Sequence, residues 1–164
     1  MMKKIIVALL STLMVMFAVT GCGAKDGGSE VKDVPTKDIV ESIKGSIELR
    51  ATGPIEGDMA SELFYISQDD VEEFTIEKGM MNTGLETIAV VKAKEGKVDA
   101  IKEAFNKVIE AKKSEAFYPG EAEAVEAAKI EVKGNYVALL IIPDYEEGQN
   151  NMDKALEAFN KAFE

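Results

Sequence analysis

The chain contains a single cysteine, Cys22, and has neither histidine nor tryptophan. A thiol does chemistry as a nucleophile, as a metal ligand or as half of a disulfide. One thiol cannot form a disulfide within the chain. Without histidine it also cannot complete a Cys/His zinc site or pair with a catalytic imidazole. The chemistry that remains for Cys22 is alkylation of its sulfur.

The residues before Cys22 follow the three-part pattern of an export signal. Met1 to Lys4 is a short basic start, Ile5 to Thr20 has no charged residue, and small residues flank the cysteine. The uncharged stretch is shorter than the ~20 residues that a helix needs to cross a bilayer, which disfavours the alternative of a permanent transmembrane anchor. We therefore expect residues 1–21 to be a signal peptide that is removed.

The four residues Val19-Thr20-Gly21-Cys22 resemble a bacterial lipobox. This resemblance implies that a diacylglycerol is attached to the Cys22 sulfur and that cleavage makes Cys22 the mature N-terminus. An ordinary secretory cleavage that leaves a free thiol is the alternative. Residues 22–33 are then the lipidated N-terminus and a flexible tether with a reach of roughly 15–20 Å. The expected location is the outer, extracytoplasmic face of the cell membrane, with the lipid bilayer as a partner through Cys22.

The composition limits the other partners. The chain has 164 residues, 46% of them hydrophobic, and a formal net charge of −11. Proteins that bind nucleic acid or anionic lipid headgroups do so mainly through clustered Lys and Arg. An acidic chain therefore predicts no nucleic-acid partner. The partners left open are an envelope protein or a small ligand.

Periodicity and turn residues predict one α+β domain over residues 34–164. Thr36, Asp58 and Asn151 are expected to cap helices, and Gly134-Asn135 suits a type II′ hairpin turn. The expected core order is β-β-α-α-β-β-α, preceded by short helices. It predicts an antiparallel sheet of about four strands with helices mainly on one face. The expected strands are 74–77, 87–91, 130–132 and 136–142, and the expected helices of the core begin after Gly96, at Glu121 and at Asn151.

A few polar and apolar residues at the ends of these elements are candidates for a binding surface. Adjacent methionines can form an adaptable surface, although filling a gap in the core is their commoner use, and packing is the default role of tyrosine. The candidate residues are Met80, Met81, Asn82, Tyr118, Asn135 and Tyr136.

Two acidic stretches, residues 67–73 and 144–150, are candidates for calcium binding. Neither has the ligand spacing of a calcium loop, and acidic residues also favour the start of a helix. We therefore expect no metal ligands and no cofactor.

Catalytic motifs are missing from the sequence. There is no nucleophile elbow, phosphate-binding glycine loop or zinc-protease motif, and histidine, the usual proton carrier near neutral pH, is absent. We therefore expect a non-catalytic binding or interaction domain. The alternatives are a small cell-envelope hydrolase that uses a carboxylate pair, and an acidic metal-binding protein.

An ordered set of short motifs resembles a family of small Firmicutes lipoproteins that is described only as a domain of unknown function. The resemblance covers about residues 36–163 and implies a single extracytoplasmic domain in a Gram-positive bacterium. It brings no activity, ligand or catalytic residue with it. The motifs are Leu63–Ile66, Asp70–Glu73, Met80–Asn82, Glu86–Lys94, Tyr118-Pro119 and Lys133–Val137.

Overall fold

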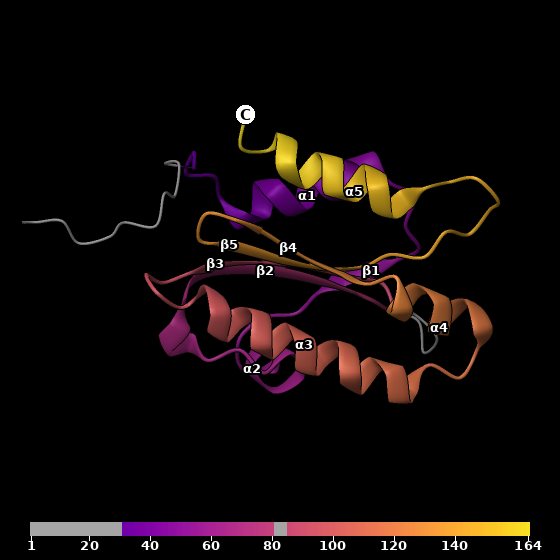
Figure 1. The fold of residues 1–164 in the computed structure, drawn as a ribbon, viewed down its shortest axis with the longest axis horizontal. Helices are drawn as coiled ribbons and strands as arrows, with labels where there is room; N and C mark the ends of the chain where they lie inside the picture. The colour runs from indigo at the N-terminus through magenta and orange to yellow at the C-terminus, as the bar shows by residue number, and fades with distance from the viewer. Residues whose placement is uncertain (1–30, 81–84) are drawn as a thin grey trace, which may run out of the picture.

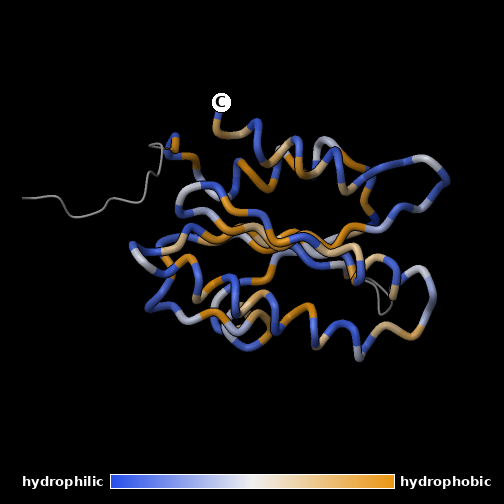
Figure 2. Tube along the Cα trace, viewed as in Figure 1, coloured by the Kyte–Doolittle hydropathy of each residue, from blue (hydrophilic) through white to orange (hydrophobic). Residues whose placement is uncertain are grey.

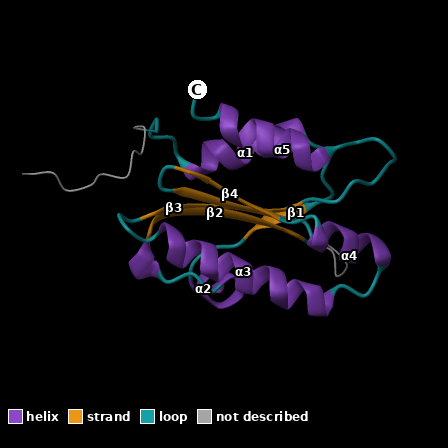
Figure 3. Ribbon diagram, viewed as in Figure 1, coloured by secondary structure: helices purple, strands orange, loops and turns teal. Residues whose placement is uncertain are grey.

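A computed structural model of the chain describes residues 31–80 and 85–164. Its centre is a five-stranded antiparallel sheet with strand order β1-β2-β3-β5-β4 (Figures 1 and 3). The strands are β1 (Thr52–Pro54), β2 (Val71–Gly79), β3 (Thr87–Ala93), β4 (Lys129–Lys133) and β5 (Tyr136–Ile141).

Helices cover both faces of this sheet (Figure 1). One face carries α1 (Thr36–Ser46) and α5 (Asn151–Lys161), which pack against each other. The other face carries α2 (Asp58–Phe64), α3 (Val98–Glu115) and α4 (Pro119–Glu126). A short 3-10 helix, η1 (Gln68–Asp70), leads into β2.

The hydrophobic core is accordingly split into two layers by the sheet (Figure 2). Alternate residues of β3 and β5 point to opposite faces, as the pleat of a strand requires. Leu139 of β5 belongs to the layer under α3, while Leu140 belongs to the layer under α1 and α5, and neither is exposed. The sheet is therefore the middle of a three-layer sandwich.

The α+β class and the antiparallel sheet are confirmed, but two details of the prediction are wrong. Helices do not lie mainly on one face, because all six residues of β5 are buried and such a strand needs cover on both sides. The sheet also has a fifth strand, β1. Its sequence Thr-Gly-Pro is typical of a loop between two elements. An edge strand nevertheless tolerates proline, because one side of its backbone needs no hydrogen-bond partner.

The predicted hairpin turn is confirmed, while the three predicted helix caps are not. Of the two turn residues, Gly134 alone has positive φ, at 60°, as a type II′ turn requires. Each helix cap lies one residue earlier than predicted, at Pro35, Gly57 and Asn150. None of the described helices has the length and apolar character needed to cross a membrane.

Candidate functional site

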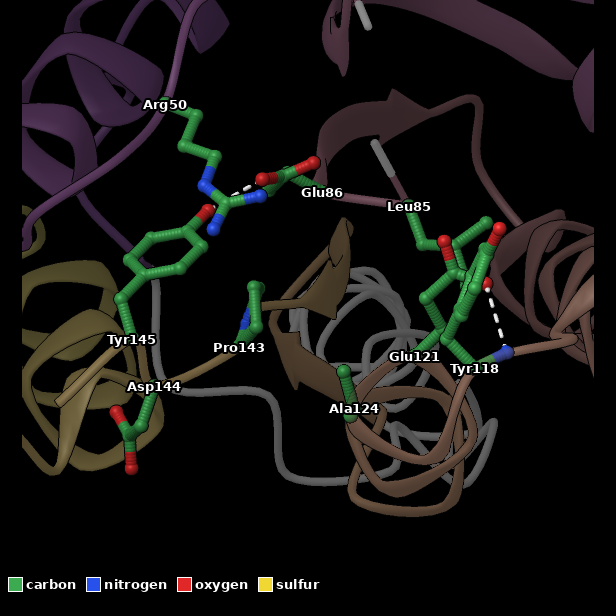
Figure 4. A pocket seen from close by; sticks show the side chains of 10 residues that line it. Arg50, Leu85, Glu86, Tyr118, Glu121, Ala124, Pro143, Asp144 and Tyr145 are labelled. Atoms are coloured by element: carbon green, nitrogen blue, oxygen red, sulfur yellow. Dashed lines mark hydrogen bonds between the residues drawn. The ribbon is translucent and has the colours of Figure 1, made fainter. Parts of the chain in front are cut away.

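A pocket of about 420 Å³ opens at the end of the sheet where β3 begins and β5 ends (Figure 4). Four separate segments form its walls: the connection between α1 and β1, the residues just before β3, the start of α4, and the loop between β5 and α5. The lining residues are Arg50, Leu85, Glu86, Tyr118, Gly120, Glu121, Ala124, Pro143, Asp144 and Tyr145.

A buried carboxylate and a tyrosine meet on one side of this pocket. The Tyr145 hydroxyl donates a hydrogen bond to Oε1 of Glu86, whose residue is only 3% exposed. Oε2 of Glu86 is buried and has no hydrogen-bond partner among the described residues. Burial, followed by the neighbouring Glu86, raises the pKa of Tyr145 well above its ordinary value. The phenol therefore stays protonated, and keeps donating to Glu86, to higher pH than an ordinary tyrosine would.

Arg50, the one arginine of the chain, lies beside this pair. Its guanidinium carbon is 4.5 Å from the centre of the Tyr145 ring, over the ring face (Figure 4). The side chain belongs to an exposed residue. Among the ion pairs of the described residues, none within 4.0 Å involves Arg50. The guanidinium is therefore a charge that the rest of the described fold leaves open to a ligand.

The two other carboxylates of the pocket hold local structure together. Oε2 of Glu121 accepts hydrogen bonds from the backbone N–H groups of Phe117 and Tyr118, at 3.2 and 3.3 Å. Oδ1 of Asp144 accepts from the backbone N–H of Asn151, at 2.7 Å. Figure 4 shows the Asp144 side chain pointing away from Arg50 and Glu86. Both carboxylates therefore stabilise the segments that form the pocket wall.

Asn151 fixes the two loops that carry Arg50 and Tyr145. It is 1% exposed, and its side-chain amide donates to the carbonyl oxygens of Pro143, at 3.2 Å, and Glu48, at 3.4 Å. This explains why it is not the helix cap. Its side chain links the loop after β5 to the segment after α1. The cap position of α5 is taken by Asn150, which has a left-handed conformation.

The candidate binding residues predicted from the sequence do not form one continuous surface. Met80 and Tyr118 are exposed and lie at the pocket end of the sheet, and Tyr118 lines the pocket. Asn135 and Tyr136 lie at the opposite end, because the antiparallel register pairs Tyr136 with Lys92 at the end of β3. Met81, Asn82 and Cys22 lie outside the described residues.

Tyr136 is a structural residue that holds the beginning of the domain. It is 1% exposed, and its hydroxyl donates to Oδ1 of Asp33, at 2.8 Å, and accepts from the backbone N–H of Val34, at 3.0 Å. Lys92 also binds Asp33, and with the tyrosine hydroxyl it lowers the pKa of that carboxyl. These hydrogen bonds hold Asp33 and Val34 at the end of the sheet opposite the pocket.

The acidic stretches hold no metal cluster in the described part of the chain, where no group of three or more potential metal ligands occurs. In the first stretch, the Ser67 hydroxyl accepts from the backbone N–H of Asp69 at the start of η1. Asp70 and Glu72 form ion pairs with Lys97 and Lys92, at 2.7 and 3.0 Å. These contacts agree with the helix-start interpretation of residues 67–73.

Comparison with known protein families gives one match. The family described as "Domain of unknown function (DUF4358)" matches residues 45–142. The chain belongs to this family. The matched stretch of the DUF4358 domain contains all five strands and α2 to α4, while most of α1 and all of α5 lie outside it. The matched stretch is shorter than residues 36–163, the range predicted from the resemblance in the sequence. No curated protein and no solved structure matches the chain.

Sequence reasoning missed three central residues of the pocket: Arg50, Glu86 and Tyr145. Two signals pointed to them. Arg50 is the one arginine among many lysines, and Glu86 is a charged residue directly before the apolar strand β3. Both Arg50 and Glu86 lie within the matched stretch, whereas Tyr145 follows it.

Proposed function

We propose that this protein is a lipid-anchored binding domain on the outer, extracytoplasmic face of the cell membrane. In this proposal a diacylglyceryl group on Cys22 holds it at the bilayer, and the pocket around Arg50 binds its ligand. The observation that carries the binding role is the accessible guanidinium in a pocket of about 420 Å³, which is large enough for a small molecule or for one chemical group of a larger envelope component.

The contacts of the pocket favour binding over catalysis. A carboxylate-pair hydrolase needs an acid and a base or nucleophile that are both free to reach the substrate. Here Glu86 accepts from Tyr145, Glu121 from two backbone N–H groups, and Asp144 from the backbone of Asn151. Their hydrogen bonds stabilise the pocket walls, which is the role expected of carboxylates in a binding site.

The anchoring part of the proposal rests on the sequence before the domain. The basic start, the uncharged stretch and the lipobox residues Val19 to Cys22 stand in the order that lipid attachment requires. A diacyl group supplies the two chains that stable membrane anchoring usually takes.

Replacing Cys22 by alanine tests the anchor. We expect the wild-type protein to sediment with membranes after cell fractionation and to label with radioactive palmitate. The Cys22→Ala variant has no sulfur to alkylate, so it should lose the label and most of its membrane association. A Ser29→Ala variant is the matched control and should behave as the wild type. A palmitate label that persists in Cys22→Ala would show that the lipobox interpretation is wrong.

The proposed anchor also predicts an orientation. Val31, the first described residue, lies against Gly134 in the β4–β5 turn, and the pocket is at the other end of the sheet. We therefore expect the pocket to open away from the membrane. A fluorophore on Lys133→Cys, in the turn, should be quenched more strongly by brominated lipids than one on Glu147→Cys, in the loop after Tyr145. Equal quenching at both sites would contradict this orientation.

A further inference from the structure

We propose that the pocket recognises an oxyanion, a carboxylate or a phosphate group, on a small ligand with an apolar or aromatic body, and that Arg50 is the residue that reads it. This inference rests on the proposed binding function and specifies the ligand class of the same site.

The first step of the argument concerns accessibility. Glu86 is 3% exposed and its Oε2 is buried, so this carboxylate presents little surface to the solvent. Arg50 is exposed, and within the described part of the chain it has no carboxylate within 4.0 Å. At this wall of the pocket, a ligand therefore first meets the positively charged guanidinium of Arg50.

The second step concerns the shape of that cation. A guanidinium presents its N–H donors as a planar fork that matches a carboxylate or phosphate through paired hydrogen bonds. The face of the Tyr145 ring attracts the positive charge of Arg50. This contact does not use the N–H donors of the guanidinium, which stay available for a ligand. The hydrogen bond from Tyr145 to Glu86 holds the ring in place. Arg50 is thus positioned in advance while its donors stay available.

The third step concerns the rest of the ligand. Leu85, Ala124 and Pro143 contribute apolar surface to the pocket, and the exposed ring of Tyr118 stands at its other side (Figure 4). Ligand pockets commonly combine such apolar walls with a few polar groups that fix orientation. An oxyanion on Arg50 with an aromatic or aliphatic body against these walls uses both features.

Four probes of similar size and different charge test the inference on the full chain purified in detergent. They are phenyl phosphate, benzoate, benzylamine and benzyl alcohol. Amide chemical-shift changes in nuclear magnetic resonance spectra report where each one binds. We expect phenyl phosphate and benzoate to shift the pocket residues, with Kd on the order of 1 mM for molecules of this size, and benzylamine and benzyl alcohol to bind much more weakly. Comparing the two anions shows which oxyanion the site prefers.

Three variants identify the group responsible. Arg50→Gln should weaken binding of the preferred anion by about 10- to 100-fold, as expected for loss of charged hydrogen bonds, and Arg50→Lys should recover only part of that loss. Glu86→Gln removes a neighbouring negative charge and should strengthen anion binding by a few fold, on the order expected for partly screened charges. Lys133→Gln removes a cation at the opposite end of the sheet and should change nothing.

Two outcomes overturn the inference and are distinguishable from each other. If benzylamine binds in the pocket more tightly than both anions, the ligand class is wrong while the binding role survives. If none of the four probes shifts the pocket residues, or if Arg50→Gln binds the anions as well as the wild type, the pocket has no oxyanion site. The Cys22 experiment decides membrane anchoring independently of either result.

Discussion

Replacing Leu139 by alanine is expected to lower the free energy of unfolding by about 2–5 kcal/mol, and replacing its neighbour Leu140 should cost a similar amount. Both side chains are fully buried, but they point to opposite faces of β5. Each substitution removes apolar contacts and leaves a cavity in a different core layer. Either loss is a large part of the roughly 5–15 kcal/mol that stabilises an ordinary domain.

Urea unfolding of the two variants, followed by circular dichroism, tests the three-layer architecture directly. A sheet covered on one face would leave one of the two leucines in solvent and its replacement nearly neutral. Leu63→Ala is the matched control, since Leu63 on α2 is 45% exposed, and it should cost less than about 1 kcal/mol. A near-neutral result for either Leu139 or Leu140 would contradict the second helical layer.

Replacing Tyr145 by phenylalanine is expected to lower the free energy of unfolding by about 1–3 kcal/mol, the usual cost of leaving a buried polar group without its partner. The ring remains, so packing against Arg50 is retained. The hydroxyl that donates to Glu86 is lost, and both oxygens of that buried carboxylate are then without a described partner. Tyr65→Phe is the control. Tyr65 is 50% exposed, and its replacement should change the free energy of unfolding by less than about 0.5 kcal/mol.

The ionisation of Tyr145 supplies a second readout of the same contact. Its pKa is raised above the ordinary value of 10.0, chiefly by burial and then by Glu86. The folded state therefore favours the protonated phenol. The resulting stability is fully present below pH 10 and is lost as the pH rises toward the higher folded-state pKa. In an alkaline absorbance titration, Tyr145→Phe should remove a late-ionising tyrosine. If the absorbance lost in Tyr145→Phe belongs to a tyrosine that ionises near the ordinary pKa of 10.0, Tyr145 is not held as a buried hydrogen-bond donor.

The candidate site shows how far local sequence patterns reach. Gly134-Asn135 predicts its hairpin because turn chemistry depends on neighbouring residues alone. The pocket cannot be predicted in that way. Arg50, Glu86 and Tyr145 come from three segments separated by dozens of residues, and no local pattern in any one segment shows that the three side chains meet. Tyr136 has the packing role that is the default for a tyrosine and not the alternative role in binding, because its side chain is buried and its hydroxyl donates to Asp33.

The sequence by itself determined the α+β class, the main strands and the tight hairpin. These follow from hydrophobic periodicity and turn residues, which act over a few positions. The sequence also indicated that β3 and β5 are covered on both faces, because both strands are apolar on both faces. Only the tertiary structure decided which helices cover each face and which side chains meet at the sheet end. Strand order and register bring those residues together, and they are set by the packing of the whole domain.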